Sequence, residues 1–435
     1  MRTYRTLFPL LLLASIALAQ HADRLDRERA QVMLQEVAND VRTHYYDPKL
    51  HGVDWDARVR DAKQKIAGAG SSGELPLQIA ALFESLNDSH TAFYPPRDPI
   101  APEYGFRFQP IGNRCFVTQV RPRSDAEARG LRPGDEILSI NDFSATRESL
   151  DNMLYVVNVL LPQSRLHLEL RDPTGHVRHA DVAIEIRQAH MADLDDMTGR
   201  DAQRLRLESE DHQRRNRVRE MQYGNDLLVI KFPQFTAANA DALSGDLRAA
   251  HDVRTVILDL RGNPGGEETA LQATLANFFD HEVPLATRVT RTGEKKLTVA
   301  GSRQNGYAGK LIVLVDSHSA SAAELFARVI QLEKRGKVLG DRTSGSVMEA
   351  EYFDHTTGIN PVFHYGAMVS IADLIMSDGK SLEHTGVLPD QLIVPSPDDL
   401  AANRDPVLAR ATELANVNLT PEAAAKLFPF EWPMR

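Results

Sequence analysis

The stretch RTVILDLRGNPGG, residues 254–266, decides the fold class. Its first half is an apolar run typical of a buried strand, and its second half is a glycine-rich turn. Two further strand-like runs follow at 311–315 (LIVLV) and 337–340 (KVLG), with a helical pattern over 320–335 between them. Strands that alternate with helices predict an α/β domain with a largely parallel sheet.

Two loops follow the first two predicted strands, at the end of a parallel sheet where ligands bind. The first carries Gly262, Gly265 and Gly266, whose amides can point outward and bind a phosphate or an oxyanion; a plain strand-to-helix turn would look the same. The second, DSHSASAAE at 316–324, puts Ser321 near the start of a helix, where the helix dipole favours an anionic transition state. An ordinary N-cap serine gives the same pattern.

A nucleophilic serine needs a base, and the chain has 15 histidines. His90 stands beside Ser89 in LNDSHTAFYPP, residues 86–96, between a predicted helix end and a proline-rich loop. Loops carry function more often than element interiors do, although Asp-Ser-His is also a good turn sequence. His318 is close to Ser321 in the sequence, but it leaves the sheet on a short loop and need not face that serine.

Periodicity divides the rest of the chain. Helical spacing of apolar residues fills 20–98, and alternating strand patterns fill 103–187. Residues 188–222 are strongly charged with both signs, which is typical of a solvated helix or linker rather than a nucleic-acid-binding arm. We therefore expect a multidomain α/β protein whose core covers 223–400, followed by a helical tail at 401–435.

The stretch MRTYRTLFPLLLLASIALA, residues 1–19, is typical of a cleaved secretory signal, with a basic start, an apolar run and a small-x-small cleavage site. Its apolar run is shorter than the roughly 20 residues that a membrane span needs. We expect an exported protein, periplasmic or extracellular, with no membrane span once the signal is removed.

The composition argues against several functional classes. A formal net charge of −10 argues against a nucleic-acid binder, which would need a basic face. A single cysteine, Cys115, excludes an intrachain disulfide framework and a thiolate metal cluster. The sequence has neither a His-Glu-x-x-His pattern nor an Asp-rich calcium loop, so we expect no metal and no organic cofactor.

Five motifs in order resemble the C-terminal processing (tail-specific) serine proteases, including their tricorn-core and retinoid-binding-protein-like branch. The second motif is the most specific part of a stretch, 104–186, that resembles a PDZ domain. The motifs are DSHTAFYPP (88–96), RGLRPGDEILSIND (129–142), VILDLRGNPGG (256–266), LIVLVDSHSASAAE (311–324) and EHTGVLPD (383–390).

One position departs from the Ser-Lys members of this family. They carry a lysine in a Gly-x-x-Thr-x-Gly-Lys segment, whereas GDRTSGS at 340–346 has Ser346 there. Lys337 and Lys380 lie outside the motif. The departure puts a Ser-Lys dyad in doubt and turns attention to the tricorn-like branch, which uses a Ser-His pair, a nucleophilic serine and a glutamate.

The resemblance to that branch implies a role for each matching residue. Ser89 and His90 match the Ser-His pair, with His90 as the base, Ser321 matches the nucleophile, and Glu383 matches the acid that orients the imidazole. The tricorn core has an Asp after the nucleophile, whereas this chain has Ala322, which leaves its preference for substrate ends open.

The resemblance also implies an oxyanion hole and a peptide-binding loop. The amide of Ala322 and a glycine amide from Gly265 and Gly266 would bind the oxyanion. The segment Tyr104, Gly105, Phe106 and Arg107 falls where a PDZ domain holds the carboxylate of a substrate C-terminus.

The expected function is therefore an exported serine endopeptidase that hydrolyses peptide bonds in unfolded or tailed proteins. A catalytically inactive, peptide-binding scaffold of the same fold is the alternative, favoured by the missing lysine. A carrier of hydrophobic small molecules is a third reading, opposed by the PDZ-like stretch and the retained nucleophile. Protein or peptide substrates are the expected partners, and a homo-oligomer is left open.

Overall fold

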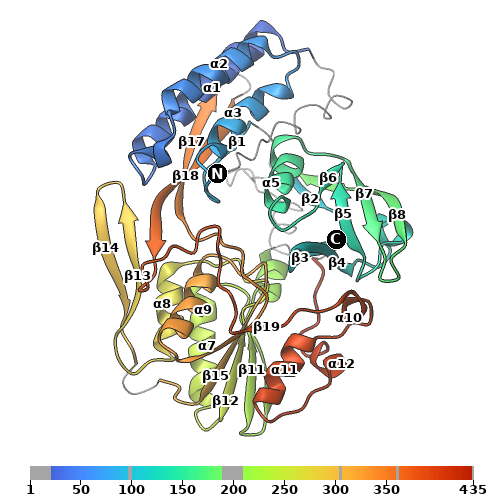
Figure 1. Ribbon diagram of the computed structural model, residues 1–435, viewed down its shortest axis with the longest axis vertical. Helices are drawn as coiled ribbons and strands as arrows, with labels where there is room; N and C mark the ends of the chain where they lie inside the picture. The colour runs from blue at the N-terminus through green and yellow to red at the C-terminus, as the bar shows by residue number, and fades with distance from the viewer. Residues whose placement is uncertain (1–20, 97–99, 189–208, 303–305, 359–361, 434–435) are drawn as a thin grey trace, which may run out of the picture. The chain divides into compact units, whose positions relative to one another are not determined.

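The computed structural model describes residues 21–96, 100–188, 209–302, 306–358 and 362–433 (Figure 1). The expected signal segment, 1–19, lies outside the described residues. The chain divides into two compact units. The first contains the chain up to 97 with 156–162 and 349–372, and the second contains the remainder.

The first unit packs helices against two long antiparallel strands. An aspartate starts each of the first two helices: Asp23 accepts a hydrogen bond from the Asp26 N–H (2.8 Å), and Asp54 accepts one from the Ala57 N–H (2.9 Å). Its elements are α1 (Arg24–His44), η1 (Leu50–Gly52), α2 (Trp55–Gly68), α3 (Glu74–Glu84), β1 (Ala92–Tyr94), η2 (Val156–Leu160), β17 (Glu349–Thr357) and most of β18 (Phe363–Ile375).

The membership of β17 and β18 in this unit differs from the expected continuous core over 223–400. Tyr365, Ala367 and Val369 alternate along β18 and are buried in the same cluster as the apolar faces of the helices. Phe93 of β1 pairs with Ala367 in antiparallel register. This hairpin therefore completes the core of the helical unit, because helices with one apolar face need a partner to cover it.

The stretch that resembles a PDZ domain is a β-rich region of the second unit. Its antiparallel sheet has the order β3-β4-β5-β7-β8, with β6 on β5 and a separate β2–β9 pair. Leu166, Leu168 and Leu170 alternate into its core from one strand. Its elements are β2 (Ile100–Glu103), β3 (Phe106–Ile111), β4 (Arg114–Val120), α4 (Asp125–Ala128), β5 (Glu136–Ile140), β6 (Phe143–Ser144), α5 (Leu150–Tyr155), β7 (Arg165–Arg171), β8 (Val177–Ala183) and β9 (Glu185–Gln188).

The α/β core confirms the expected parallel sheet. The order is β10-β11-β12-β15-β16-β19, and every pair is parallel except β10 with β11. The sheet strands are β10 (Arg219–Tyr223), β11 (Leu227–Lys231), β12 (Thr255–Asp259), β15 (Lys310–Val315), β16 (Gly336–Gly340) and β19 (Gln391–Leu392).

Helices and a hairpin surround this sheet in the second unit. Apolar residues of α7, α8 and α9 bury one face of the sheet, and those of α11 bury the other. The elements are α7 (Ala237–Ala249), α8 (Glu268–Ala276), β13 (Val283–Thr290), β14 (Gly293–Val299), α9 (Ala322–Leu332), α10 (Pro397–Ala401), α11 (Pro406–Leu414) and α12 (Pro421–Ala424).

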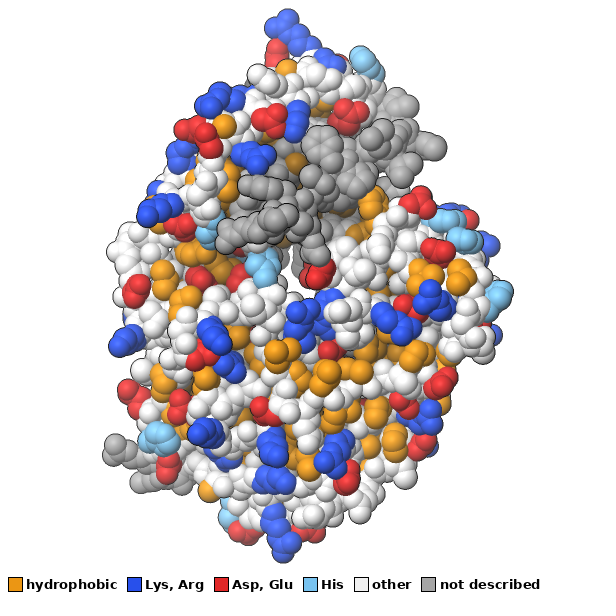
Figure 2. Space-filling model, in the orientation of Figure 1, with side chains coloured by type: hydrophobic (Ala, Val, Ile, Leu, Met, Phe, Trp, Pro, Cys, Tyr) orange, Lys and Arg blue, Asp and Glu red, His pale blue; other side chains and the backbone are white. Residues whose placement is uncertain are grey.

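Part of the expected linker, 188–222, has regular structure. Residues 209–215 are helical, and β10 begins at Arg219. No helix in the described part of the chain is long and apolar enough to cross a membrane. Acidic and basic side chains are interspersed on the face drawn in Figure 2, whereas basic ones would dominate a phosphate-binding face.

Candidate active site

Ser321 lies directly before α9 with a backbone conformation that non-glycine residues rarely adopt. Its φ is 54° and its ψ is −119°, a strain that costs of order 1–3 kcal/mol. Its N–H donates to the Ser346 carbonyl (2.9 Å) and to Glu324 Oε2 (3.0 Å). These contacts hold the half-buried serine in a sharp strand-to-helix turn, the geometry that presents a nucleophile at the end of a sheet.

Glu324 fixes this turn from inside the core. Its side chain is fully buried, and its Oε2 also accepts the Ser346 N–H (3.0 Å). Its Oε1 accepts the Gly345 N–H (2.7 Å) and the Thr343 hydroxyl (2.6 Å). Burial raises the pKa of Glu324, and these hydrogen bonds oppose that rise. One carboxylate thus joins the nucleophile turn to the loop at 343–346.

The glycine loop lies against Ser321. A β-carbon on Gly265 would stand 2.7 Å from Ser321 Cβ and 3.0 Å from the Ala322 nitrogen, and its φ of 101° also favours glycine. Ala322 is the first residue of α9, and its N–H has no intrahelical acceptor. The structure therefore brings Ser321, Ala322 and Gly265 together.

Asn263 decides how the amides of the glycine loop are used. It is fully buried, and its Oδ1 accepts the Gly265 N–H (2.8 Å). Its carbonyl accepts the Ala320 N–H (3.0 Å), which ties the glycine loop to the nucleophile loop. Because the Gly265 N–H already donates to Asn263, the N–H groups of Ala322 and Gly266 are the candidate oxyanion donors.

An ion network anchors the base of the glycine loop. Arg261 forms ion pairs with Asp259 and with Asp405, each at 2.8 Å, and Lys231 lies 3.2 Å from Asp259. Burial acts to raise the pKa of Asp259, but the charges of Arg261 and Lys231 outweigh it and hold that pKa well below its usual range. These ion pairs thus hold the backbone at the point where the glycine loop follows β12.

Glu383 contacts the same loop as Ser321 does. Its side chain is 10% exposed, and its Oε2 accepts the Val347 N–H (2.9 Å). Oε1 lies 3.6 Å from His384 Nε2. Val347 follows Ser346, whose carbonyl accepts the Ser321 N–H, so Glu383 and Ser321 are joined through two consecutive residues.

Ser89 and His90 form a pair in the first unit. Ser89 Oγ lies 2.7 Å from His90 Nδ1. The Asp88 carboxylate accepts the His90 N–H (2.9 Å) and the Thr91 N–H (2.6 Å), and the Ser370 hydroxyl donates to it as well (2.9 Å). Asp88 therefore makes the turn that the sequence suggested, and Ser89 Oγ contacts the histidine ring within that turn.

The lysines do not replace the missing family lysine. Lys337 pairs with Ile312, so it sits near the start of β16, whereas Ser321 follows the carboxyl end of the neighbouring strand. Lys380 is exposed in the turn after β18. Ser346 occupies the lysine position and contributes its backbone carbonyl and N–H to the turn.

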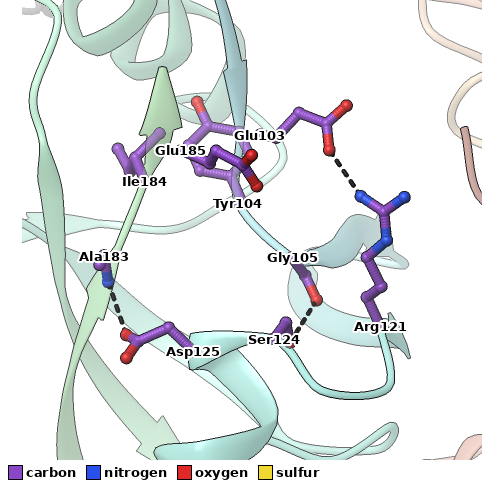
Figure 3. Close-up of a pocket in the computed structure, with 9 residues that line it drawn as sticks. All are labelled: Glu103, Tyr104, Gly105, Arg121, Ser124, Asp125, Ala183, Ile184 and Glu185. Carbon is purple, nitrogen blue, oxygen red and sulfur yellow. Dashed lines mark hydrogen bonds and ion pairs between the residues drawn. The ribbon is translucent and has the colours of Figure 1, made fainter. Parts of the chain in front are cut away.

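The expected peptide-binding loop borders a pocket of about 180 Å³ (Figure 3). Gly105 has a φ of 71°, and its carbonyl accepts the Arg121 N–H (2.8 Å) and the Ser124 hydroxyl (3.2 Å). Tyr104 and Phe106 pack into the core of the region. Arg107 is exposed, and its guanidinium lies 4.9 Å from the centre of the Phe430 ring.

Several residues of this site escaped the sequence analysis. Glu324 was within reach, because Ser-Ala-Ala-Glu at 321–324 has the spacing of a capping box, and the structure forms that box. Asn263, Asp88 and Arg121 gave no signal, since their partners come from distant or irregular segments.

Comparisons with known proteins agree with this architecture. Residues 226–393 match the model of peptidase family S41, residues 100–170 match the PDZ domain, and residues 26–77 match the tricorn protease C1 domain. The α/β core that carries the Ser321 turn thus matches a peptidase family model, and the β-rich region before it matches the PDZ domain. Over 226–393 the chain is thus similar to peptidase family S41, and over 26–77 it is similar to the tricorn protease C1 domain.

The relatives span both branches of the resemblance. A tricorn protease homolog 2 from Streptomyces coelicolor is 24% identical over 401 residues, which cover 87% of this chain and 32% of that protein. A carboxyl-terminal-processing protease from Synechocystis is 26% identical over 294 residues, covering 65% of this chain and 60% of that protein. The chain therefore spans from about a third to about three fifths of the length of these two relatives.

Solved structures share the fold. Mature CPAF complexed with lactacystin matches with a TM-score of 0.64 and 14% identity, over 87% of this chain and 96% of that one. The photosystem II D1 C-terminal processing protease matches with a TM-score of 0.51 and 18% identity, over 85% of this chain and 94% of that one.

Proposed function

We propose that this protein is a serine endopeptidase that hydrolyses peptide bonds in unfolded or tailed proteins. The observation that carries the proposal is the strained Ser321 turn, with the free first amide of α9 and the glycine loop packed against it. Backbone strain of this kind persists where the surrounding structure holds it, and it clusters at active sites.

The proposed reaction is acyl transfer in two steps. The His90 imidazole takes the proton of the Ser321 hydroxyl while Oγ attacks the scissile carbonyl carbon. The protonated imidazole then gives that proton to the leaving amine, and the C–N bond breaks to leave an ester on Ser321. Water, deprotonated by the same imidazole, attacks the ester; the C–O bond to Ser321 breaks, the imidazolium returns the proton to Oγ, and the new carboxyl group is released.

Ser89 and Glu383 support this base. The contact of Ser89 Oγ with His90 Nδ1 at 2.7 Å supports an arrangement in which Nε2 is the nitrogen that exchanges protons. Glu383 would stabilise the imidazolium, directly or through Ser89, as the acid of a triad does. The Ala322 N–H and a glycine N–H would bind the oxyanion, each worth about 10²–10³ in rate.

The PDZ domain is the proposed site of substrate capture. Domains of this type add an extended peptide to a sheet edge and hold its terminal carboxylate. β3 is an edge strand of its sheet, which supports such an addition. Tyr104, Gly105, Phe106 and Arg107 form the loop where the peptide end would bind.

We also propose that the protein is exported, on the pattern of residues 1–19. Fractionation of expressing cells tests this, with Arg2→Glu and Arg5→Glu together as the variant. Export predicts a mature chain that lacks about 19 residues in the periplasm or medium, and retention of the wild-type precursor in the cytoplasm would contradict it.

Cleavage of an unfolded protein tests the peptidase. We expect activity to be lost in Ser321→Ala and His90→Ala, with no further loss in the double variant because the two act as a unit. Ser346→Ala should retain activity, since its contacts use backbone atoms. Equal activity in wild type and Ser321→Ala would refute the nucleophile. A folded chain that cleaves no substrate but binds peptides would favour the inactive scaffold, which the missing lysine supports.

A further inference from the structure

The last described segment of the chain, Phe428–Pro433 (FPFEWP), lies on four arginines. We call these six residues the tail segment and the four arginines the arginine platform. Two of the arginines belong to the PDZ domain and two lie in the residues that lead into the α/β core. The platform consists of Arg107, Arg121, Arg214 and Arg219.

The PDZ arginines contact the aromatic rings of the tail segment. Arg107 lies 4.9 Å from the Phe430 ring centre, and Arg121 lies 5.5 Å from the Trp432 ring centre. Arg121 also donates a hydrogen bond to the Pro433 carbonyl. The two rings meet edge to face at 5.1 Å. These are favourable cation–π and aromatic geometries.

The other two arginines contact the acidic residue and the first aromatic ring. Arg214 forms an ion pair with Glu431 at 2.5 Å. Arg219 lies 5.6 Å from the Phe428 ring centre and donates to the Pro429 carbonyl at 3.1 Å. Each aromatic or acidic residue of the tail segment is thus contacted by a guanidinium.

The contacts of Phe430 and Glu431 have the character of exchangeable binding, whereas Phe428 also packs against a core cluster, and Arg121 is buried and paired with Glu103 at 2.7 Å. Phe430 remains 39% exposed, and the side chain of Glu431 remains 34% exposed. Exposed cation–π contacts and ion pairs are individually weak, so the segment is held by their number and by its tether. A buried anchor such as Phe326 holds its place by another mechanism, the exclusion of water.

Arg107 also belongs to the loop assigned above to substrate ends, so the tail segment and a substrate end would meet the same guanidinium.

We propose that the arginine platform is a binding site for peptide segments that combine aromatic and acidic residues, and that the tail segment occupies it as an internal competitor. A tethered segment has an effective concentration in the millimolar range, so a peptide in solution must outcompete it. Peptide binding stands independently of catalysis. The competition with substrate rests on the proposed peptidase function.

Binding of a labelled FPFEWP peptide tests the platform in a Ser321→Ala background, where no cleavage occurs. Fluorescence anisotropy compares the full chain with a Phe430→Ala, Trp432→Ala double variant. We expect the double variant to bind the peptide at least tenfold more tightly, because its platform is vacated. Adding Arg107→Ala and Arg121→Ala should abolish binding, whereas Arg165→Ala, an exposed arginine on β7, should not.

Equal affinity of the two chains for the peptide would overturn the proposal, as would binding that survives loss of both PDZ arginines. A second measurement needs no substitution in the tail segment. Of the two tryptophans, Trp55 is 4% exposed, so iodide quenching reports mainly Trp432. A tryptophan-free peptide, FPFEFP, should increase this quenching as it displaces the segment; unchanged quenching at millimolar peptide would contradict the proposal.

The consequence for catalysis is measured separately with Ser321 intact. The double variant should lower KM for a tailed substrate with aromatic and acidic residues and leave kcat within about twofold. If the peptide binds as expected but no chain cleaves, the peptidase proposal fails and the platform stands. If cleavage occurs and KM is unchanged, the competition fails.

Discussion

Replacing Glu324 by glutamine perturbs the nucleophile turn without changing the volume of the core. The carboxylate accepts four hydrogen bonds, from the amides of Ser321, Gly345 and Ser346 and from the Thr343 hydroxyl. A glutamine side chain offers one carbonyl oxygen and presents an NH₂ group in place of the other. Two of the four donors would then face a donor.

The expected loss follows from this count. Two buried donors without acceptors cost about 2–6 kcal/mol at about 1–3 kcal/mol each. Removing a buried charge returns part of that cost, and the raised pKa of Glu324 indicates that its charge is disfavoured by burial. We therefore expect the free energy of unfolding to fall by about 2–4 kcal/mol.

The same substitution should reach the active site. The Oε2 atom of Glu324 holds the N–H groups of Ser321 and Ser346, and the strained φ of Ser321 depends on such contacts. Relaxation of the turn moves Oγ, and a displacement of about 1 Å can cost about 10²-fold in rate. We expect kcat for an unfolded substrate to fall by about 10–100-fold with little change in KM.

Denaturant unfolding between pH 4 and pH 8 and steady-state cleavage are the two assays. Because the pKa of Glu324 is raised in the fold, its stabilising contribution is fullest below the ordinary carboxyl value of 4.5 and is lost as the pH rises through the raised pKa. The stability difference between wild type and Glu324→Gln should therefore change with pH. The control is Glu413→Gln, whose side chain is 59% exposed. A Glu324→Gln chain as stable and as active as wild type would refute the reasoning.

Three further substitutions have defined outcomes. Gly265→Ala should lower kcat at least 100-fold, because the new β-carbon would stand 2.7 Å from Ser321 Cβ. The control is Gly262→Ala, which has open space around it and should cost only about 1–2 kcal/mol of backbone strain. Equal effects of the two substitutions would contradict the close approach. Asp405→Asn should lower the unfolding free energy by about 1–3 kcal/mol, less than the cost of breaking a fully buried ion pair, because Arg261 still has Asp259 as a partner. An unchanged melting transition would show that the network is dispensable. Burial lowers the pKa of His318 from 6.5, so its contribution to stability is full above pH 6.5 and is lost as the pH falls. On acidification to pH 5, wild type should therefore lose more stability than His318→Gln. Parallel plots of unfolding free energy against pH would argue against a buried neutral imidazole.

The strands and the nucleophile turn could be predicted because their signals are local. The runs at 255–259 and 310–315 are apolar over a strand length and end in turn residues, so periodicity alone identifies them. The helix after Ser321 likewise begins with a capping-box sequence. Such patterns depend only on residues a few positions apart in the sequence, so they can be recognised without knowledge of the fold.

The hairpin at 349–372 could not be assigned in the same way. Its alternation predicts strands, but an alternating pattern does not say which core the apolar face will cover. Tyr365 and Ala367 pack with the helical unit more than 260 positions earlier in the chain. The four donors to Glu324 and the tail segment on its arginines are similar cases, since each joins segments whose separate sequences look ordinary.

The serine in place of the family lysine fits this division between local and distant signals. Ser346 supports the nucleophile turn through its carbonyl, which accepts the Ser321 N–H, and through its N–H, which donates to Glu324. Every residue type except proline supplies both groups. The side chain at 346 can therefore change without loss of the turn, so the missing lysine bears on the identity of the base and not on the turn. Catalysis at Ser321 would then need another base, and the Ser89–His90 pair is the group proposed for that role.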